Sequence, residues 1–294
     1  MKRLFAAVLC LCLLTGCGQA STGDICRAKE GTEDGASVKT ETPGQNAGSG
    51  GETFRVIRAE DGGAPLLLAK ADGGPGDVYT LSLKDTELTL DGAAFDRNEP
   101  GAYQNLPGKN LTGALVEVAY DLVLETYPGQ LAEVTAVNIR SDGFDDRCAL
   151  YLRVLNDLWT VDEGLNSDVT AVSVDLSQTS LTESEQAAVA WAFGGEHGIS
   201  QVLSLNYEQL AAEGYLTGAD PDSDGMPCWE NGCLFTITEQ GTGDNELNGA
   251  RNTVTFDAQK WRSALGAYFF ADCTAEQALD GHWGDYTVGS EAIS

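Results

Sequence analysis

An acidic loop in the last third of the chain holds the side chains that calcium prefers. Asp220, Asp222 and Asp224 alternate along the sequence and are followed by a glycine. Calcium loops place carboxylates at their first, third and fifth ligand positions in this way. The twelfth position, usually a bidentate glutamate, is an asparagine here, and Glu230 stands one residue before it. Two interpretations stay open: a weak calcium site made by these four carboxylates, or an acidic surface turn.

Two cysteines in the same region could form a disulfide. Cys228 and Cys233 flank the sequence Trp-Glu-Asn-Gly. An Asn-Gly pair favours a tight hairpin turn, which would place the two thiols across from each other. We therefore predict a disulfide between them, with two free thiols or half of a zinc site as alternatives. Zinc needs two more ligands, and neither His197 nor His282 has a recognisable spacing to these cysteines.

One further pair could carry nucleophilic chemistry. Cys273 and His282 lie nine residues apart and could act as a thiol nucleophile and its base. No third orienting group and no oxyanion-hole motif accompanies them, so we predict no catalytic residue. A cell-envelope hydrolase that uses either this pair or a pair of carboxylates is kept as an alternative function. Cys26 and Cys148 complete an odd number of cysteines beyond residue 20, and the pairing of these two and of Cys273 stays open.

The tryptophans are the last group of residues with a possible role in ligand binding. Exposed on one face they could line a platform for a sugar ring, but within helices and strands they more often belong to the core. The core interpretation is the one we adopt. His197 follows a predicted helix and is expected to interact with its last carbonyl groups. The tryptophans concerned are Trp191, Trp229, Trp261 and Trp283.

Composition limits the partners. The 294-residue chain has 45 acidic and 17 basic residues, and its formal charge is −28. We expect no nucleic-acid binding, because a phosphate backbone is bound mainly through lysine and arginine. The two histidines leave little room for a histidine-rich metal centre. The apolar fraction of 42% is near that of globular proteins, so most of the chain should fold.

The first residues predict export. Lys2 and Arg3 precede eleven apolar residues, 4–14, a run too short to span a bilayer as a helix. The sequence Leu-Thr-Gly-Cys that ends at Cys17 resembles the lipobox of bacterial lipoproteins. The resemblance implies a signal peptide over 1–16, lipidation (palmitate) of the Cys17 thiol, and attachment to the extracytoplasmic face of a bacterial cell membrane through the lipid alone.

The segment after this cysteine reads as a tether. Residues 18–52 contain eight glycines and no aromatic residue, so they cannot form a packed core. We assign the lipidated cysteine and the flexible tether to residues 17–52. A chain of this composition spans roughly 30–35 Å on average, which would hold a folded domain clear of the lipid head groups.

Short strands with turn signals follow over residues 53–141, which predicts a small β-barrel. The segment Gly-Ala-Leu-Val-Glu-Val-Ala-Tyr-Asp-Leu-Val-Leu-Glu-Thr-Tyr-Pro-Gly-Gln, residues 113–130, resembles the late strands of OB-like barrels in Gram-positive lipoproteins. Leu122 stands where that family usually has a glycine, after Asp121. The predicted strands are Phe54–Ile57, Leu66–Ala69, Val78–Leu83, Glu87–Leu90, Leu115–Leu122 and Leu131–Ile139.

Residues 145–294 predict an α+β domain. Apolar residues at helical spacing predict a helix that opens at Asp145-Asp146, and a capping box opens a second helix at Thr182. The further expectations are strands at Val169–Leu176 and Gln201–Leu205, a short helix at Tyr207–Ala212, and late strands at Cys233–Thr238, Asn252–Phe256, Trp261–Phe270 and Tyr286–Val288.

This half also resembles a known module. Pieces such as "LTESEQAAVAWAFG" and "FDAQKWRSALGAYFFADCTA" are similar to an extracytoplasmic module of Gram-positive lipoproteins, which also follows membrane metallopeptidases of the antibiotic-sensor type. The resemblance implies a sensing or accessory role and names no catalytic residue.

The sequence therefore predicts an α+β protein: a small OB-like antiparallel barrel, then an α+β domain with two or three helices and a late antiparallel sheet. Its expected function is non-enzymatic binding or sensing of an envelope or extracellular ligand. The alternatives are the hydrolase and a structural module stiffened by calcium, the one cofactor considered.

Overall fold

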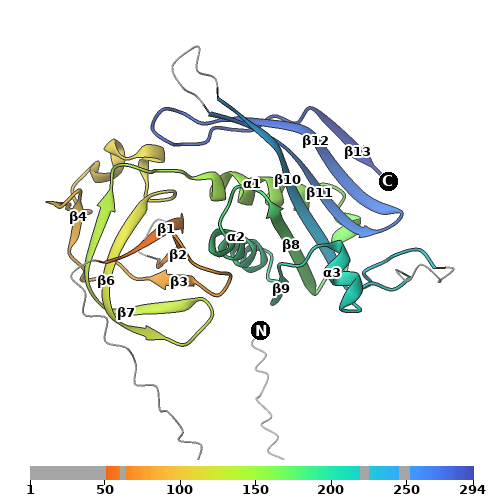
Figure 1. Ribbon diagram of the computed structural model, residues 1–294, viewed down its shortest axis with the longest axis horizontal. Coiled ribbons are helices and arrows are strands. Elements are labelled where there is room, and N and C mark those ends of the chain that lie inside the picture. Colours follow the sequence, from red (N-terminus) through yellow and green to blue (C-terminus); the bar gives the residue numbers. More distant parts are fainter. Residues whose placement is uncertain (1–50, 60–63, 219–224, 245–251) are drawn as a thin grey trace, which may run out of the picture. The chain divides into compact units, whose positions relative to one another are not determined.

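A computed structural model describes residues 51–59, 64–218, 225–244 and 252–294 (Figure 1). Over these residues the protein is mixed α+β, with a closed five-strand barrel, a second sheet and three α-helices. No helix among them is long and apolar enough to cross a bilayer. The predictions that lie outside the described residues are the signal peptide, all but the end of the tether, Cys17, Cys26, Asp220, Asp222 and Asp224.

The barrel strands pair in the order β3-β2-β1-β6-β7, and a parallel pairing of β3 with β7 closes the ring. The other four pairings are antiparallel. Phe54 and Val56 point into the barrel from alternate positions of its first strand. This order is consistent with the predicted OB-like barrel. The strands are β1 (Glu52–Arg58), β2 (Leu66–Lys70), β3 (Val78–Leu81), β6 (Leu115–Leu124) and β7 (Gly129–Arg140).

A short extension is added to the barrel between β3 and β6. The strand β4 (Leu88–Leu90) pairs with the far end of β7 and with β5 (Ala93–Ala94). Two 3₁₀ helices, η1 (Ala102–Asn105) and η2 (Pro107–Lys109), follow. They lead the chain back to β6. Asn105, Leu106 and Pro107 of this segment line a pocket.

The second sheet has the order β13-β12-β11-β10-β8-β9. Its last four strands are antiparallel neighbours, as predicted, but β8 pairs in parallel with both β9 and β10, so the whole sheet is mixed. Parallel neighbours require a crossover, which a helix supplies here. The strands are β8 (Ala171–Gln178), β9 (Gln201–Leu203), β10 (Gly232–Asp244), β11 (Asn252–Ser263), β12 (Gly266–Glu276) and β13 (Ser290–Ile293).

The helices are α1 (Arg147–Thr160), α2 (Glu183–Glu196) and α3 (Tyr207–Ala212), with a 3₁₀ turn η3 (Glu163–Asn166) after the first. The predicted capping box of α2 is confirmed, because the Thr182 side chain accepts from the Glu185 N–H and the Glu185 carboxylate accepts from the Thr182 N–H. The helical period predicted for α1 is also confirmed: its apolar residues at that spacing are all buried, namely Tyr151, Val154, Leu155 and Leu158.

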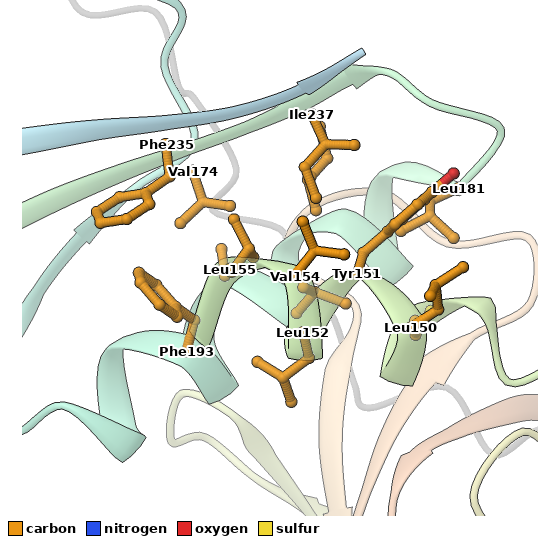
Figure 2. Packing of buried hydrophobic residues seen from close by; sticks show 14 of the residues in the cluster. Leu150, Tyr151, Leu152, Val154, Leu155, Val174, Leu181, Phe193, Phe235 and Ile237 are labelled. Atoms are coloured by element: carbon orange, nitrogen blue, oxygen red, sulfur yellow. The ribbon is translucent and has the colours of Figure 1, made fainter. Parts of the chain in front are cut away.

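The barrel and the second sheet share a core. Helix α2 packs against barrel strands on one side and against β8 and β9 on the other (Figure 1). Its Ser184 hydroxyl, fully buried, donates to the carbonyl of Lys70 in β2 at 2.6 Å. Barrel residues Ile57 and Leu67 belong to the same buried cluster as the α1 and α2 side chains of Figure 2. The predicted segments 53–141 and 145–294 thus fold against each other through α2.

Several local predictions were wrong. The strand expected at 261–270 crosses a turn, since β11 ends at Ser263 and β12 begins at Gly266. Only an isolated bridge is found within the strand expected at 286–288, and β13 lies two residues later. The family's turn after Asp121 is absent, because β6 continues through Leu122, which pairs with Ala132 in β7.

Candidate functional site

The structure does not form the predicted disulfide: Cys228 and Cys233 are both free. The expected hairpin does not exist, because the chain at Cys228 pairs with Thr217 and Ser263, whereas Gly232 starts β10 beside β8. Trp229 is folded beneath Gly232, where an added Cβ would lie 2.0 Å from the indole ring. The chain still turns here, because the Gly232 N–H donates to the Trp229 carbonyl at 3.4 Å, but the two flanking segments pair with different partners.

Most of the predicted calcium loop lies outside the described residues. Of the four predicted calcium ligands only Glu230 is described, and it is exposed before β10, where its backbone carbonyl accepts from Arg262 at 2.6 Å. Among the described residues no group of three or more histidine, cysteine, aspartate or glutamate side chains could hold a metal ion.

The Cys273–His282 pair has no support as a nucleophile and base. Cys273 is fully buried in the core shared by the helices and the sheet, and burial raises its pKa to about 12. A thiol with that pKa is almost entirely protonated at neutral pH. His282 has a different partner, the carboxylate of Asp146.

The core interpretation is confirmed for two tryptophans, since Trp229 and Trp283 are 1% and 0% exposed. His197 does sit at the C-cap of α2, but its ring stacks on Trp159 at 4.2 Å. Its Nε2 bonds the side-chain oxygen of Asn156 at 2.7 Å instead of the last helical carbonyls, and burial lowers its pKa.

A pocket of about 570 Å³ lies between the barrel extension and the C-terminal sheet. The η1–η2 segment forms one side, the connector from β7 to α1 forms the floor, and the loop after β12 forms the other side. This volume is within the range of small-molecule sites, roughly 300–1,000 Å³. The apolar lining residues are Leu90, Leu106, Pro107, Phe144, Ala278 and Leu279, and the polar ones are Asn105, Ser141, Asp142, Asn252, Gln277 and Asp280.

The loop after β12 is held by hydrogen bonds to the start of α1. Asp146, 5% exposed, accepts from the backbone N–H of Trp283 at 2.7 Å and from Nδ1 of His282 at 2.5 Å. Asp145 accepts from the Trp283 indole N–H at 2.7 Å. Burial raises the pKa of Asp146, while these donors act in the opposite direction. The loop is therefore attached at three points.

Two glycines allow the close approach that these bonds require. Gly113 at the start of β6 has a φ of +92°, and a Cβ there would lie 2.7 Å from the Asp146 side chain. Gly281 has a φ of +93°, and a Cβ there would lie 2.0 Å from the Phe144 carbonyl oxygen. Neither position can take another residue without moving a wall of the pocket.

Further bonds fix the loop internally. The amide of Gln277, 9% exposed, accepts from the Asn252 side chain at 2.8 Å and donates to the Gly281 carbonyl at 3.0 Å. The Asp280 carboxylate accepts from the His282 N–H at 3.2 Å. The loop is thus shaped before any ligand arrives, which lowers the entropic cost of binding.

A smaller cavity of about 240 Å³ lies where α2 begins, lined by Arg55 and Arg147. Its charges are compensated: Arg55 pairs with Glu185 at 3.3 Å, and Arg147 lies 3.6 Å from Glu239. The Arg147 Nε is buried without a hydrogen-bond partner. Because both cations already have carboxylate partners, this cavity offers little net charge to a ligand.

Sequence reasoning singled out Asp145 and Asp146 only as the start of a helix. Their contacts with residues 282 and 283 span more than 130 positions, and no local pattern announces such a pairing. Comparisons of the chain with protein-family models, with curated proteins and with solved structures found no match.

Proposed function

We propose that this protein is a lipid-anchored, extracytoplasmic binding or sensing protein of a bacterial cell membrane, with an OB-like barrel at its N-terminal side. The pocket between the barrel extension and the C-terminal sheet is its ligand site. The observation that carries the proposal is this preformed pocket, which has apolar walls and a few convergent polar groups, as small-molecule sites do.

Binding is favoured over hydrolysis by the state of the thiols. The form of the hydrolase alternative that uses Cys273 needs a reactive thiol, and burial raises the pKa of this thiol to about 12. Nucleophilic cysteines instead have a lowered pKa and are partly exposed. His282 bonds the buried Asp146 carboxylate at the start of α1, a contact that supports the loop.

The ligand should not be an anion. Of the side chains that line the pocket, none is basic and two are carboxylates, Asp142 and Asp280. The formal charge of −28 adds a long-range repulsion of anions. An acidic surface also disfavours nucleic acid, the usual ligand of many OB folds.

The binding proposal is tested by blocking the pocket. Asn105→Trp places an indole in the pocket wall, and Gln104→Trp adds the same bulk on η1 at an exposed position that does not line it. In a thermal-shift screen of the full chain against soluble cell-wall fragments, a fragment that stabilises the wild type should stabilise Gln104→Trp equally and Asn105→Trp little. Equal shifts in both variants would place the site elsewhere.

The membrane proposal has its own test. Cys17→Ser should move the protein from the membrane fraction to the medium and abolish incorporation of labelled palmitate. An unchanged membrane fraction for this variant would contradict lipid anchoring while leaving the pocket argument untouched.

A further inference from the structure

We propose that the pocket binds an organic cation, an amine or guanidine with an apolar body, and that Asp280 receives its charge. This inference rests on the proposed function, since it names the ligand class of the same site. Its first observation is that Asp280 lines the pocket and no lysine or arginine of the described residues pairs with it. Within the described part of the chain, its one hydrogen-bond donor is the backbone N–H of His282, at 3.2 Å.

The other carboxylate of the pocket is already neutralised. Asp142 accepts two hydrogen bonds from Arg140, both at 2.8 Å. This bidentate contact is the main cause that lowers the Asp142 pKa. A cation entering the pocket would therefore find Asp142 occupied and Asp280 available.

The described lysines and arginines of the C-terminal half all interact with other parts of the fold, and none of them forms an ion pair with Asp280. Arg153 donates to the Gly284 carbonyl at 2.8 Å, and Arg262 donates to the carbonyls of Ser167 and Glu230, each at 2.6 Å. Lys260 is fully buried, and Arg147 pairs with Glu239. The solvent side of this half is left with carboxylates, which attract a cationic ligand.

The apolar walls of the pocket indicate the chemistry of the uncharged part of the ligand. Leu106 and Phe144 are 7% and 8% exposed and offer the pocket an apolar surface. Leu279, 79% exposed, stands at the rim next to Asp280 and could be covered by a ligand. A hydrated metal ion would gain nothing from these apolar contacts, whereas an amine with an aromatic or aliphatic body would use them together with Asp280.

The test uses three small probes that differ in charge: phenethylamine, 2-phenylethanol and phenylacetate. Their binding to the full chain is measured by calorimetry in wild type, Asp280→Asn and Asp285→Asn. Asn at position 280 can still accept from the His282 N–H, so the loop is kept. Asp285 is an exposed carboxylate five residues away that does not line the pocket, so its variant controls for the loss of one negative charge.

We expect the amine to bind best to the wild type, and Asp280→Asn to weaken it by about three- to tenfold, the range for a partly exposed ion pair with a charged hydrogen bond. Asp285→Asn should change its affinity by less than about twofold, because a more distant exposed charge is screened. Equal losses in the two variants would overturn the inference, since diffuse charge alone would then explain the preference.

The failure of this inference can be told from the failure of the proposed function. If the alcohol or the acid binds as well as the amine, and Asn105→Trp abolishes that binding, the pocket is a ligand site but the cation class is wrong. If no probe binds and cell-wall fragments stabilise Asn105→Trp as they stabilise the wild type, both proposals fall.

A last arm separates the two sources of an organic cation. Acetyl-Leu-Lys-amide carries the amine on a peptide, and acetyl-Leu-norleucine-amide is its uncharged counterpart. Tighter binding of the lysine peptide than of its counterpart, lost in Asp280→Asn, supports the inference with a peptide as the source. Binding of phenethylamine without binding of the peptide supports it with a free amine as the source.

Discussion

The two ends of helix α1 use charged side chains in opposite ways. At its C-terminal end the Lys260 ammonium is fully buried and donates to oxygens of Trp159, Val161, Asp162 and Asn166. At its N-terminal end Asp145 and Asp146 hold the loop after β12 beside an open pocket. Both arrangements place a charge where the helix dipole favours it.

The two ends differ in how much hydrogen-bonding capacity of their charged groups the fold leaves unused. The ammonium has three hydrogens and four neighbouring oxygens, so its capacity is exhausted within the protein. Next to the other end, the exposed Asp280 lines the pocket and forms no ion pair with a described lysine or arginine. A polar group that the fold satisfies completely holds the fold together, whereas one with spare capacity beside a cavity is suited to a ligand.

The difference between the two ends would disappear if water reached the C-terminal end of α1, where Lys260 is buried and which we call the closed end. Cys233 lies there, fully buried, and burial raises its pKa to about 12. Cys228, five residues earlier, is partly exposed. Since the thiolate is the reactive form and must be reached by the reagent, we expect iodoacetamide to alkylate the partly exposed Cys228 at least about tenfold faster than the buried Cys233 in the folded protein. Peptide mapping by mass spectrometry measures both rates; similar rates would contradict a closed end.

The exclusion of water from the closed end should also make the free energy of unfolding fall at alkaline pH. The folded pKa of Cys233, about 12, is above the ordinary value of 9.0 that the unfolded chain should have. The stability from keeping this thiol protonated is therefore complete below pH 9 and is lost as the pH rises toward 12. The loss can reach about 4 kcal/mol for three pKa units. Urea unfolding at pH 8 to 11 should show a shallower decline for Cys233→Ala than for wild type, and parallel declines would contradict the assignment.

Removing the buried ammonium tests the closed end directly. Lys260→Met keeps the length of the side chain but leaves several buried oxygens without a donor, so we expect a loss of about 3 kcal/mol in the free energy of unfolding. Urea denaturation measures it. Lys84→Met, at an exposed position of the barrel, is the matched control and should change stability by less than about 0.5 kcal/mol. A loss in Lys260→Met no larger than this would show that the oxygens find water.

Much of the fold could be predicted because its signals are local. The six strands expected over residues 53–141 all coincide with observed strands, and α3 has the predicted bounds. The turn between Ser263 and Gly266 was missed because the intervening Ala-Leu has no turn residue, and the apolar run continues across it. The predicted hairpin at Asn231-Gly232 shows a different error: the chain does turn there, but Cys228 and Cys233 pair with different neighbours, so no hairpin forms.

The site could not be predicted in the same way. The pocket is assembled from η1 and η2, the β7–α1 connector and the loop after β12, which are far apart in the sequence. Asp146 was visible as a helix start and His282 as one of two histidines, but nothing along the chain links residues 136 positions apart. The alternation of β11 places Lys260 on the same face as the buried Phe256 and Ala258, but no local pattern shows which oxygens would receive its ammonium.

At the N-terminal end of α1, which we call the open end, substitutions should cost less stability than at the closed end. The cost can be assigned to individual hydrogen bonds. Asp146→Ala leaves the buried Trp283 N–H without an acceptor and should cost about 2 kcal/mol, whereas His282→Ala removes one partly exposed donor and should cost about 1 kcal/mol or less. In a double-mutant cycle the two changes should couple by roughly the cost of His282→Ala, because that bond is all that the two side chains share. Urea unfolding of both single variants and the double variant measures this coupling. Full additivity would mean that the 2.5 Å contact adds nothing to stability and that the other bonds hold the loop without it.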